Sequence, residues 1–254
     1  MSKPPQLPGD PTELHLHFGH TDALSDTPLA ETLERWDVTV LHGRDVHDDS
    51  RCPNSGSESS SDPCTRDDCP ARAKSVAVGQ MTFHRVHLDR GMNAHWALEG
   101  ESEDLYEIAQ ALLNKDTGYF TDEVDACLAY AGGLDLLIME RVTLARLWRG
   151  QGLGAILAAQ AIHRLSPGCR AVACSPGLSD IDQPPLDRAE WDRVAARVRA
   201  GWERVGFRPY KDNILLASPA DEVLEEQRAV LRAEFAELGI AWRRASAEGS
   251  RAGA

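Results

Sequence analysis

One stretch of the sequence, residues 134–165, constrains the fold more than any other. It opens with a largely apolar run of strand length, Leu134-Asp-Leu-Leu-Ile-Met-Glu-Arg-Val-Thr-Leu144. Three glycines within five positions follow, at 150, 152 and 154, and they release the backbone from β geometry. Helical spacing then begins, carried by Leu153, Ile156, Leu157, Ala161 and Leu165. The stretch therefore predicts a buried strand, a glycine turn and a helix.

A glycine turn in this position is suited to binding phosphate. The N-terminus of a helix combines free backbone N–H groups with the positive end of the helix dipole. Glycines let a pyrophosphate approach the backbone, and the guanidinium of Arg149 can add a charged contact. The simpler alternative is a strand-to-helix turn that binds nothing.

The turn, Arg149-Gly-Gln-Gly-Leu-Gly154, resembles the acetyl-CoA loop of the GNAT N-acetyltransferase superfamily, Arg/Gln-x-x-Gly-x-Gly/Ala. A second segment, Gly201-Trp-Glu-Arg-Val-Gly-Phe-Arg-Pro-Tyr210, resembles the family's Gly-Phe segment and is followed by a strand at residues 213–217. The resemblance covers residues 134–217. It implies an α/β fold of the α+β kind: a mixed, mostly antiparallel sheet flanked by helices, with a parallel strand pair around the loop.

The resemblance also implies a reaction, the transfer of an acetyl group from acetyl-CoA to a primary amine by direct attack on the thioester. The thioester oxygen needs a hydrogen-bond donor, which relatives supply from the backbone before the loop. The residues expected to contact acetyl-CoA are Thr143, Leu144, Arg149, Gly150, Gln151, Gly152, Leu153 and Gly154. The acceptor is expected to be a small molecule or a peptide.

Two residues are candidates for proton transfer. Glu140 lies four residues before Leu144, so it can face the same side of the strand and act as base or as anchor for the ammonium group. Its alternative is an exposed carboxylate paired with Arg141 or Arg146, and Asp135 is the reserve base.

Where many relatives carry the tyrosine that protonates the departing thiolate, this chain has Trp202, whose indole has no useful acidity. Tyr210 is the candidate acid in its place. The missing tyrosine also allows a catalytically degenerate CoA-binding module. His84, on an expected strand at 76–88, is a further acceptor-site candidate, for which a structural role is the simpler interpretation.

The rest of the chain is expected to form one domain with extensions. Residues 1–10 read as a flexible N-terminus, 11–217 as a single acyltransferase-like domain, 218–244 as a C-terminal helix and 245–254 as a flexible tail. An exposed or disordered insert is expected at 47–75. The apolar stripe of the C-terminal helix can pack on the domain or form a homodimer; it consists of Leu224, Leu231, Phe235 and Leu238.

Further strands are expected at 13–18 and 36–41, and helices at 102–113, 121–130 and 187–205. The two helices between 102 and 130 come directly before the central strand. In GNAT proteins such a pair usually follows the first strand, so the topology departs from the family pattern.

Charge and apolar content limit the classes of partner that the chain is expected to bind. The formal net charge of −13 argues against nucleic acid. The chain has neither an 18-residue apolar stretch nor an apolar signal core at its start, so no membrane association and a cytoplasmic location are expected.

Metal binding is the weaker alternative. Cys52, Cys64 and Cys69 with His42 or His47 would make a zinc-dependent interaction protein, but their spacing is not the paired C-x₂-C of zinc ribbons. His15 and His17 share one face of the first strand and are more often solvent-facing, so no metal site is predicted. The other cysteines are expected to be buried thiols: Cys127, Cys169 and Cys174.

Overall fold

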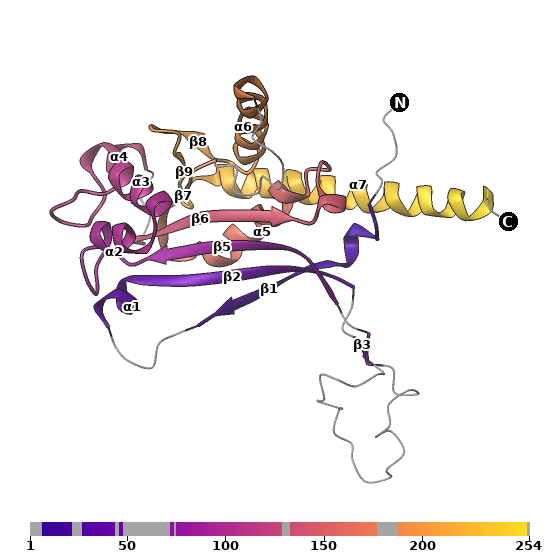
Figure 1. Ribbon diagram of the computed structural model, residues 1–254, viewed down its shortest axis with the longest axis horizontal. Coiled ribbons are helices and arrows are strands. Elements are labelled where there is room, and N and C mark those ends of the chain that lie inside the picture. The colour runs from indigo at the N-terminus through magenta and orange to yellow at the C-terminus, as the bar shows by residue number, and fades with distance from the viewer. Residues whose placement is uncertain are drawn as a thin grey trace, which may run out of the picture.

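The computed structural model describes residues 7–21, 27–43, 46–47, 72–73, 75–128, 133–176 and 187–252. Its centre is a seven-stranded mixed sheet flanked by helices (Figure 1). In spatial order the strands are β1 (Leu14–His20), β2 (Leu33–His42), β5 (Val76–Val86), β6 (Asp135–Leu144), β7 (Cys169–Cys174), β9 (Leu215–Ala217) and β8 (Arg208–Pro209). The pair β6–β7 is parallel and all other neighbours are antiparallel, which confirms the expected fold class. Two short strands, β3 (Val46–His47) and β4 (Arg72–Ala73), pair separately.

The helices begin where the sequence supplies capping residues. They are α1 (Pro28–Thr32), α2 (Ala94–Glu101), α3 (Glu103–Leu112), α4 (Asp122–Cys127), α5 (Leu153–Leu165), α6 (Arg188–Glu203) and α7 (Glu222–Ala252), with 3₁₀ turns η1 (Pro11–Glu13) and η3 (Arg146–Trp148). Ser102, Thr121 and Asp187 cap α3, α4 and α6 as their side chains accept from the first-turn N–H groups. Helix α2 was not expected, although Asn93 caps it in the same way.

Two apolar cores lie on the two faces of the sheet. One is formed with α5 and α7 and contains Val38, Met81, Phe83, Leu137 and Met139. The other is formed with α2, α3 and α4, and from the sheet it takes Val86, Leu136, Ile138, Ala171 and Ala173. Figure 1 shows α2–α4 gathered at the end of the sheet where β5 finishes and β6 begins. In the chain, α2–α4 lie between β5 and β6, directly before the strand that leads to the glycine loop. The expected departure from the usual GNAT order is therefore present.

Two β-bulges change which side chains share a face. In β5, Gly79 pairs with Val40 and Ala77 with Leu41, so Val78 is the extra residue and packs with Met81. Without the bulge, strict alternation would place Val78 and Met81 on opposite faces of the strand. In β6, Arg141 pairs with Thr82 and Met139 with Phe83, which leaves Glu140 as the extra residue.

The C-terminal helix packs against the domain. Leu231 is buried, and the partly buried side chains of the same core include Leu224, Phe235, Leu238 and Trp242. The helix starts at Glu222, four residues after the expected start at 218, and runs past residue 244 into the expected tail. The stripe therefore covers the protein's own core instead of standing free for a second subunit.

The start of the described chain is fixed to this helix. Trp242 Nε1 donates to Leu7 O at 3.1 Å, and Arg243 Nη1 lies 3.1 Å from Asp10 Oδ2. Residues 7–10 are thus part of the folded domain, in contrast to the flexible N-terminus expected for 1–10. Among the helices that the structure describes, none combines the length and apolar character needed to cross a bilayer.

Candidate active site

The candidate site lies where β6 and β7 part. Their parallel pairing ends at Ile138 and Ala173, and β7 finishes at Cys174. Strand β6 continues to Leu144 with β5 on one side. Within the described chain, no strand pairs with its other edge beyond Ile138. A strand edge of this kind presents N–H and C=O groups that need a partner.

The backbone groups of β6 alternate between β5 and this open edge. Ala145 N donates to Val78 O at 2.7 Å, so the N–H groups of Thr143 and Arg141 also point toward β5. Those of Val142 and Leu144 point the other way. The carbonyl of Leu144 confirms the direction, since it accepts from Arg149 Nε at 2.5 Å. The Thr143 hydroxyl bonds back to Gln80 O at 3.3 Å.

The glycine loop leads from this edge to the N-terminus of α5. Gly150 and Gly152 have φ of 84° and 78°, a left-handed conformation that favours glycine. A Cβ atom built on Gly150 or Gly154 would meet no heavy atom within 4 Å. Gly152 caps α5 without a side-chain hydrogen bond, so the first N–H groups of the helix have no capping side chain among the described residues. The loop offers open space beside free donors, which is what a phosphate group requires.

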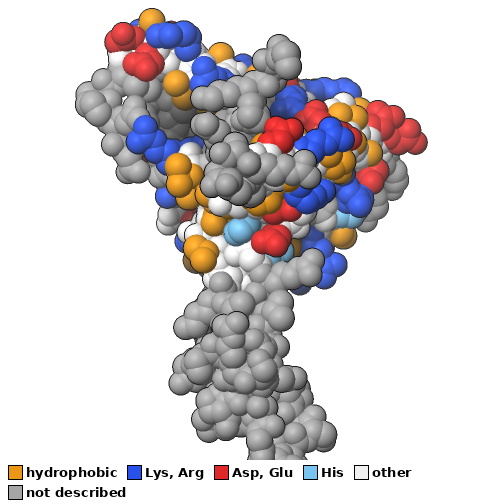
Figure 2. All heavy atoms as spheres, turned by 90° about the vertical axis from the view of Figure 1, so that its right-hand side faces the viewer, with side chains coloured by type: hydrophobic (Ala, Val, Ile, Leu, Met, Phe, Trp, Pro, Cys, Tyr) orange, Lys and Arg blue, Asp and Glu red, His pale blue; other side chains and the backbone are white. Residues whose placement is uncertain are grey.

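Side-chain placement in the loop follows the sequence prediction only in part. Gln151 is exposed, whereas Leu153 is buried in the core and anchors the first turn of α5. Arg204, which the sequence reasoning did not single out, brings Nη1 to 3.4 Å from where a Cβ of Gly152 would lie, and it pairs with Glu234. The end of the molecule at which β6 finishes faces the viewer in Figure 2, where Lys and Arg side chains lie among Asp and Glu.

Glu140 is held by a buried histidine. Its Oε2 lies 2.9 Å from His84 Nε2, and the two side chains are 20% and 1% exposed. The alternative to a role as base was pairing with Arg141 or Arg146, and among the described residues the contact of Glu140 is with His84 instead. The bulge also corrects the expected orientation: Leu144 packs on the α5 core, while Glu140 turns to the opposite face with His84. A partly exposed carboxylate between buried strands is a suitable general base.

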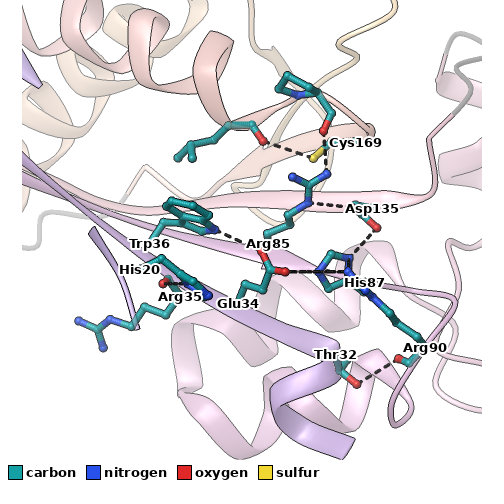
Figure 3. A network of polar contacts seen from close by, with 12 residues as sticks. His20, Thr32, Glu34, Arg35, Trp36, Arg85, His87, Arg90, Asp135 and Cys169 are labelled. Atoms are coloured by element: carbon teal, nitrogen blue, oxygen red, sulfur yellow. Dashed lines mark hydrogen bonds and ion pairs between the residues drawn. The ribbon is translucent and has the colours of Figure 1, made fainter. Parts of the chain in front are cut away.

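Asp135, the reserve base, is already engaged. It accepts from Arg85 Nε at 2.7 Å and lies 3.0 Å from His87 Nδ1 (Figure 3). His87, 4% exposed, contacts Glu34 Oε1 at 2.8 Å through its other ring nitrogen. These residues join the ends of β2, β5 and β6, away from the open edge. Asp135 therefore has a structural role, which is to hold the ends of these strands together.

The network shifts the pKa of its members. Burial would raise the pKa of Glu34, but hydrogen bonds from His87 and Trp36 and the charges of His87 and Arg85 outweigh it, so the pKa is lowered. Burial would lower the pKa of Arg85, yet its hydrogen bond to Asp135 leaves it raised.

Trp202 and Tyr210 of the second motif lie on opposite faces of the sheet. Trp202 is partly buried against the α5 core, while Tyr210 packs against the α2–α4 core. The Tyr210 hydroxyl is buried and, among the described residues, has no hydrogen-bond partner. Among the described residues, no hydrogen bond joins Tyr210 to Glu140, so the two catalytic candidates remain separate predictions.

The cysteines divide by burial. Cys169 and Cys174 are buried, as expected, and burial raises both pKa values, that of Cys169 to about 12. Cys127 is exposed, so its expected burial was wrong. Cys52, Cys64 and Cys69 lie outside the described residues, within which no group of three His, Cys, Asp or Glu could hold a metal ion.

Comparisons with known proteins give distant similarities. No family model and no curated protein matches the sequence. Among solved structures, AtaTR bound with AcCoA shares 11% identity over 78% of this chain and 72% of that chain, with a TM-score of 0.33. A point mutant of KacT shares 10% over 78% and 75%, also at 0.33. A KacTA–DNA complex shares 12% over 86% and 99%, at 0.34. TM-scores this low do not assign a function to the chain, and the residues of the site have to do so.

The contact between His84 and Glu140 could not be foreseen in the sequence. The two residues are 56 positions apart, and the bulge that brings them together has no glycine to mark it. Only the burial of a polar residue at an alternating strand position hinted that His84 needs a partner.

Proposed function

We propose that this chain is an acetyl-CoA-dependent N-acetyltransferase of the GNAT type, transferring an acetyl group to a primary amine. The observation that carries the proposal is the open edge of β6, which is followed in the chain by the uncapped glycine loop at α5. The edge offers backbone groups to an extended chain that bears amides, and the loop offers N–H groups to a pyrophosphate. Acetyl-CoA combines these two features in one molecule.

The residues present fit this co-substrate. Pyrophosphate oxygens would be held by the N–H groups of Leu153, Gly154 and Ala155, beside the open space at Gly150 and Gly154. Arg204 adds a positive charge near Gly152. Arg149 is committed to the Leu144 carbonyl, so we assign it the role of shaping the loop. Gln151, being exposed, can reach the same phosphates.

The backbone of β6 supplies the donor for the thioester oxygen. The N–H groups of Val142 and Leu144 point to the open edge, while that of Thr143 points to β5. We therefore assign the donor to Val142 or Leu144, and keep Thr143 as a residue that fixes the strand through its hydroxyl. A fixed N–H directed at a developing negative charge stabilises the transition state without reorganisation.

Glu140 is assigned as the base. Its carboxylate accepts a proton from the acceptor's ammonium group, which frees the nitrogen lone pair to attack the thioester carbon. The carbon–sulfur bond then breaks and sulfur leaves as a thiolate, while the nitrogen, which is positively charged after the attack, releases its second proton to solvent. A thiol with a pKa of about 8.5 is a tolerable leaving group near neutral pH. Tyr210, whose buried hydroxyl has no partner, is the candidate acid for that thiolate.

Two measurements test the function. Isothermal titration with acetyl-CoA should show saturable binding; an absence of heat at high protein concentration would contradict both an enzyme and a CoA-binding module. Release of free thiol in the presence of an amine panel, drawn from small molecules and peptides, should then identify acceptors. Binding without thiol release across the panel would support the degenerate module, for which the replacement of tyrosine by Trp202 is the specific observation.

A further inference from the structure

His84 occupies an unusual position for a polar residue. It lies in the middle strand of three, β2, β5 and β6, and its side chain is 1% exposed. Nε2 meets Glu140 Oε2 at 2.9 Å, while Nδ1 is buried and has no hydrogen-bond partner among the described residues. Directly opposite on β2 is Arg35, whose side chain is 55% exposed and pairs with Asp37.

These contacts select one form of the imidazole. A carboxylate oxygen only accepts hydrogen bonds, so Nε2 must carry the proton that joins it to Glu140. A proton on Nδ1 would leave a buried, charged donor without an acceptor, which is costlier than a bare lone pair. The ring therefore carries its proton on Nε2 and donates it to the carboxylate.

The histidine also fixes which oxygen of Glu140 can react. Glu140 is the extra residue of the β6 bulge, so its backbone has less support from the ladder than its neighbours. The hydrogen bond from the rigid, buried ring ties down Oε2. Among the described residues, Oε1 of Glu140 has no hydrogen-bond partner, and the side chain is 20% exposed.

We propose that His84 is a positioning residue for Glu140: its Nε2–H holds Oε2 and leaves Oε1 to take the proton of the acceptor amine. This inference rests on the proposed function. In the step, the ammonium N–H bond breaks, the proton passes to Oε1, and the electron pair stays on nitrogen. The bond from His84 persists throughout and keeps the carboxylate in place.

Three variants separate this role from that of an ordinary core histidine. His84→Leu removes the donor, and His84→Gln retains an amide N–H at the end of a chain of similar length. His95→Leu is the matched control, because His95 is 3% exposed and also has a buried, unpartnered Nδ1, but it lies on α2 and does not contact Glu140.

In acetyl transfer, His84→Leu should lower kcat by about tenfold to a hundredfold, at or below the lower end of the roughly 10²–10⁴-fold that general-base catalysis contributes, because Glu140 itself remains. The KM for acetyl-CoA should stay unchanged. His84→Gln should restore most of the lost kcat. An unchanged kcat in His84→Leu, no rescue by His84→Gln, or an equal loss in His95→Leu would overturn the proposal.

A second readout needs no activity. In protein labelled with ¹³C at glutamate carboxyls, the signal missing from Glu140→Gln identifies Glu140, and its chemical shift should change in His84→Leu and stay the same in His95→Leu. In the wild type, long-range ¹H–¹⁵N spectra should show the His84 proton on Nε2. A proton on Nδ1 would contradict the proposal even if no leucine variant folds. If acetyl transfer is absent while both signals behave as stated, the proposed function fails and the positioning role stands.

Discussion

The two glycines at the start of α5 have different roles. Gly152 adopts a φ of 78°, so most substitutions there strain the backbone, and lost binding would be hard to interpret. Gly154 has ordinary helical geometry and open space where its Cβ would be. Gly154 therefore tests the occupancy of that space with little effect on folding.

Gly154→Val should weaken acetyl-CoA binding by about a hundredfold, which corresponds to about 2.7 kcal/mol, because the isopropyl group fills the space assigned to the pyrophosphate. Gly201→Val is the control, since Gly201 also has no heavy atom within 4 Å of a built Cβ but lies on α6. Calorimetric titration and thermal denaturation of both variants provide the comparison. Equal affinity of Gly154→Val and the wild type would place the phosphates elsewhere.

Cysteine reactivity is a second residue-scale test. Burial raises the pKa of Cys169 to about 12, so at pH 8 its reactive thiolate is about ten-thousandfold less abundant than its thiol. Cys127 is exposed. Alkylation by iodoacetamide with peptide mapping should modify Cys127 in the native protein and leave Cys169 and Cys174 unmodified until denaturant is added. Early modification of Cys169 would show that its end of β7 opens readily.

At the scale of elements, polar contacts hold the ends of three strands together. His87 contacts both Glu34 and Asp135 (Figure 3). Arg85 extends this network, because it donates to the carbonyl of Pro167, which precedes β7. Since Asp135 starts β6, the network fixes the strand whose far end forms the candidate site. Substitutions that break this network should therefore lower the stability of the fold before they weaken the binding of acetyl-CoA.

The pH dependence of this network has a definite sign. The folded-state pKa of Glu34 is lowered below 4.5, so the unfolded chain binds the proton more readily. The contribution of Glu34 to stability is complete above that value and is lost as pH falls through the folded pKa. Glu34→Gln should be less stable than the wild type at neutral pH, and the difference should shrink in acid. A constant difference in thermal melting from pH 7 to pH 3 would contradict this assignment.

The sequence predicted the elements better than their faces. Residues 134–165 gave a strand, a turn and a helix because apolar spacing and glycine act locally. Strict alternation along a strand failed at Val78 and Glu140, because a bulge depends on how the neighbouring strand pairs. The contacts of Glu140 were missed for this reason, while the position of the glycine loop was correct.

For the whole molecule, α7 connects both ends of the described chain to the α5 core. Leu231→Ala should lower the free energy of unfolding by roughly 2–5 kcal/mol, because Leu231 is 1% exposed and its removal leaves a cavity. Val230→Ala is the matched control, since the neighbouring Val230 is 51% exposed. Urea denaturation of the two variants should differ clearly. Similar stabilities would mean that α7 does not fold cooperatively with the domain.

We propose that acetyl-CoA lies along the open edge of β6. Residue-resolved amide hydrogen exchange with and without acetyl-CoA tests this most directly, because the N–H groups of Val142 and Leu144 face the edge while those of Arg141 and Thr143 face β5. Exchange should slow by about tenfold or more at Val142, Leu144 and the first turn of α5, and change little at Arg141 and Thr143. Binding that leaves Val142 and Leu144 unprotected would contradict the account.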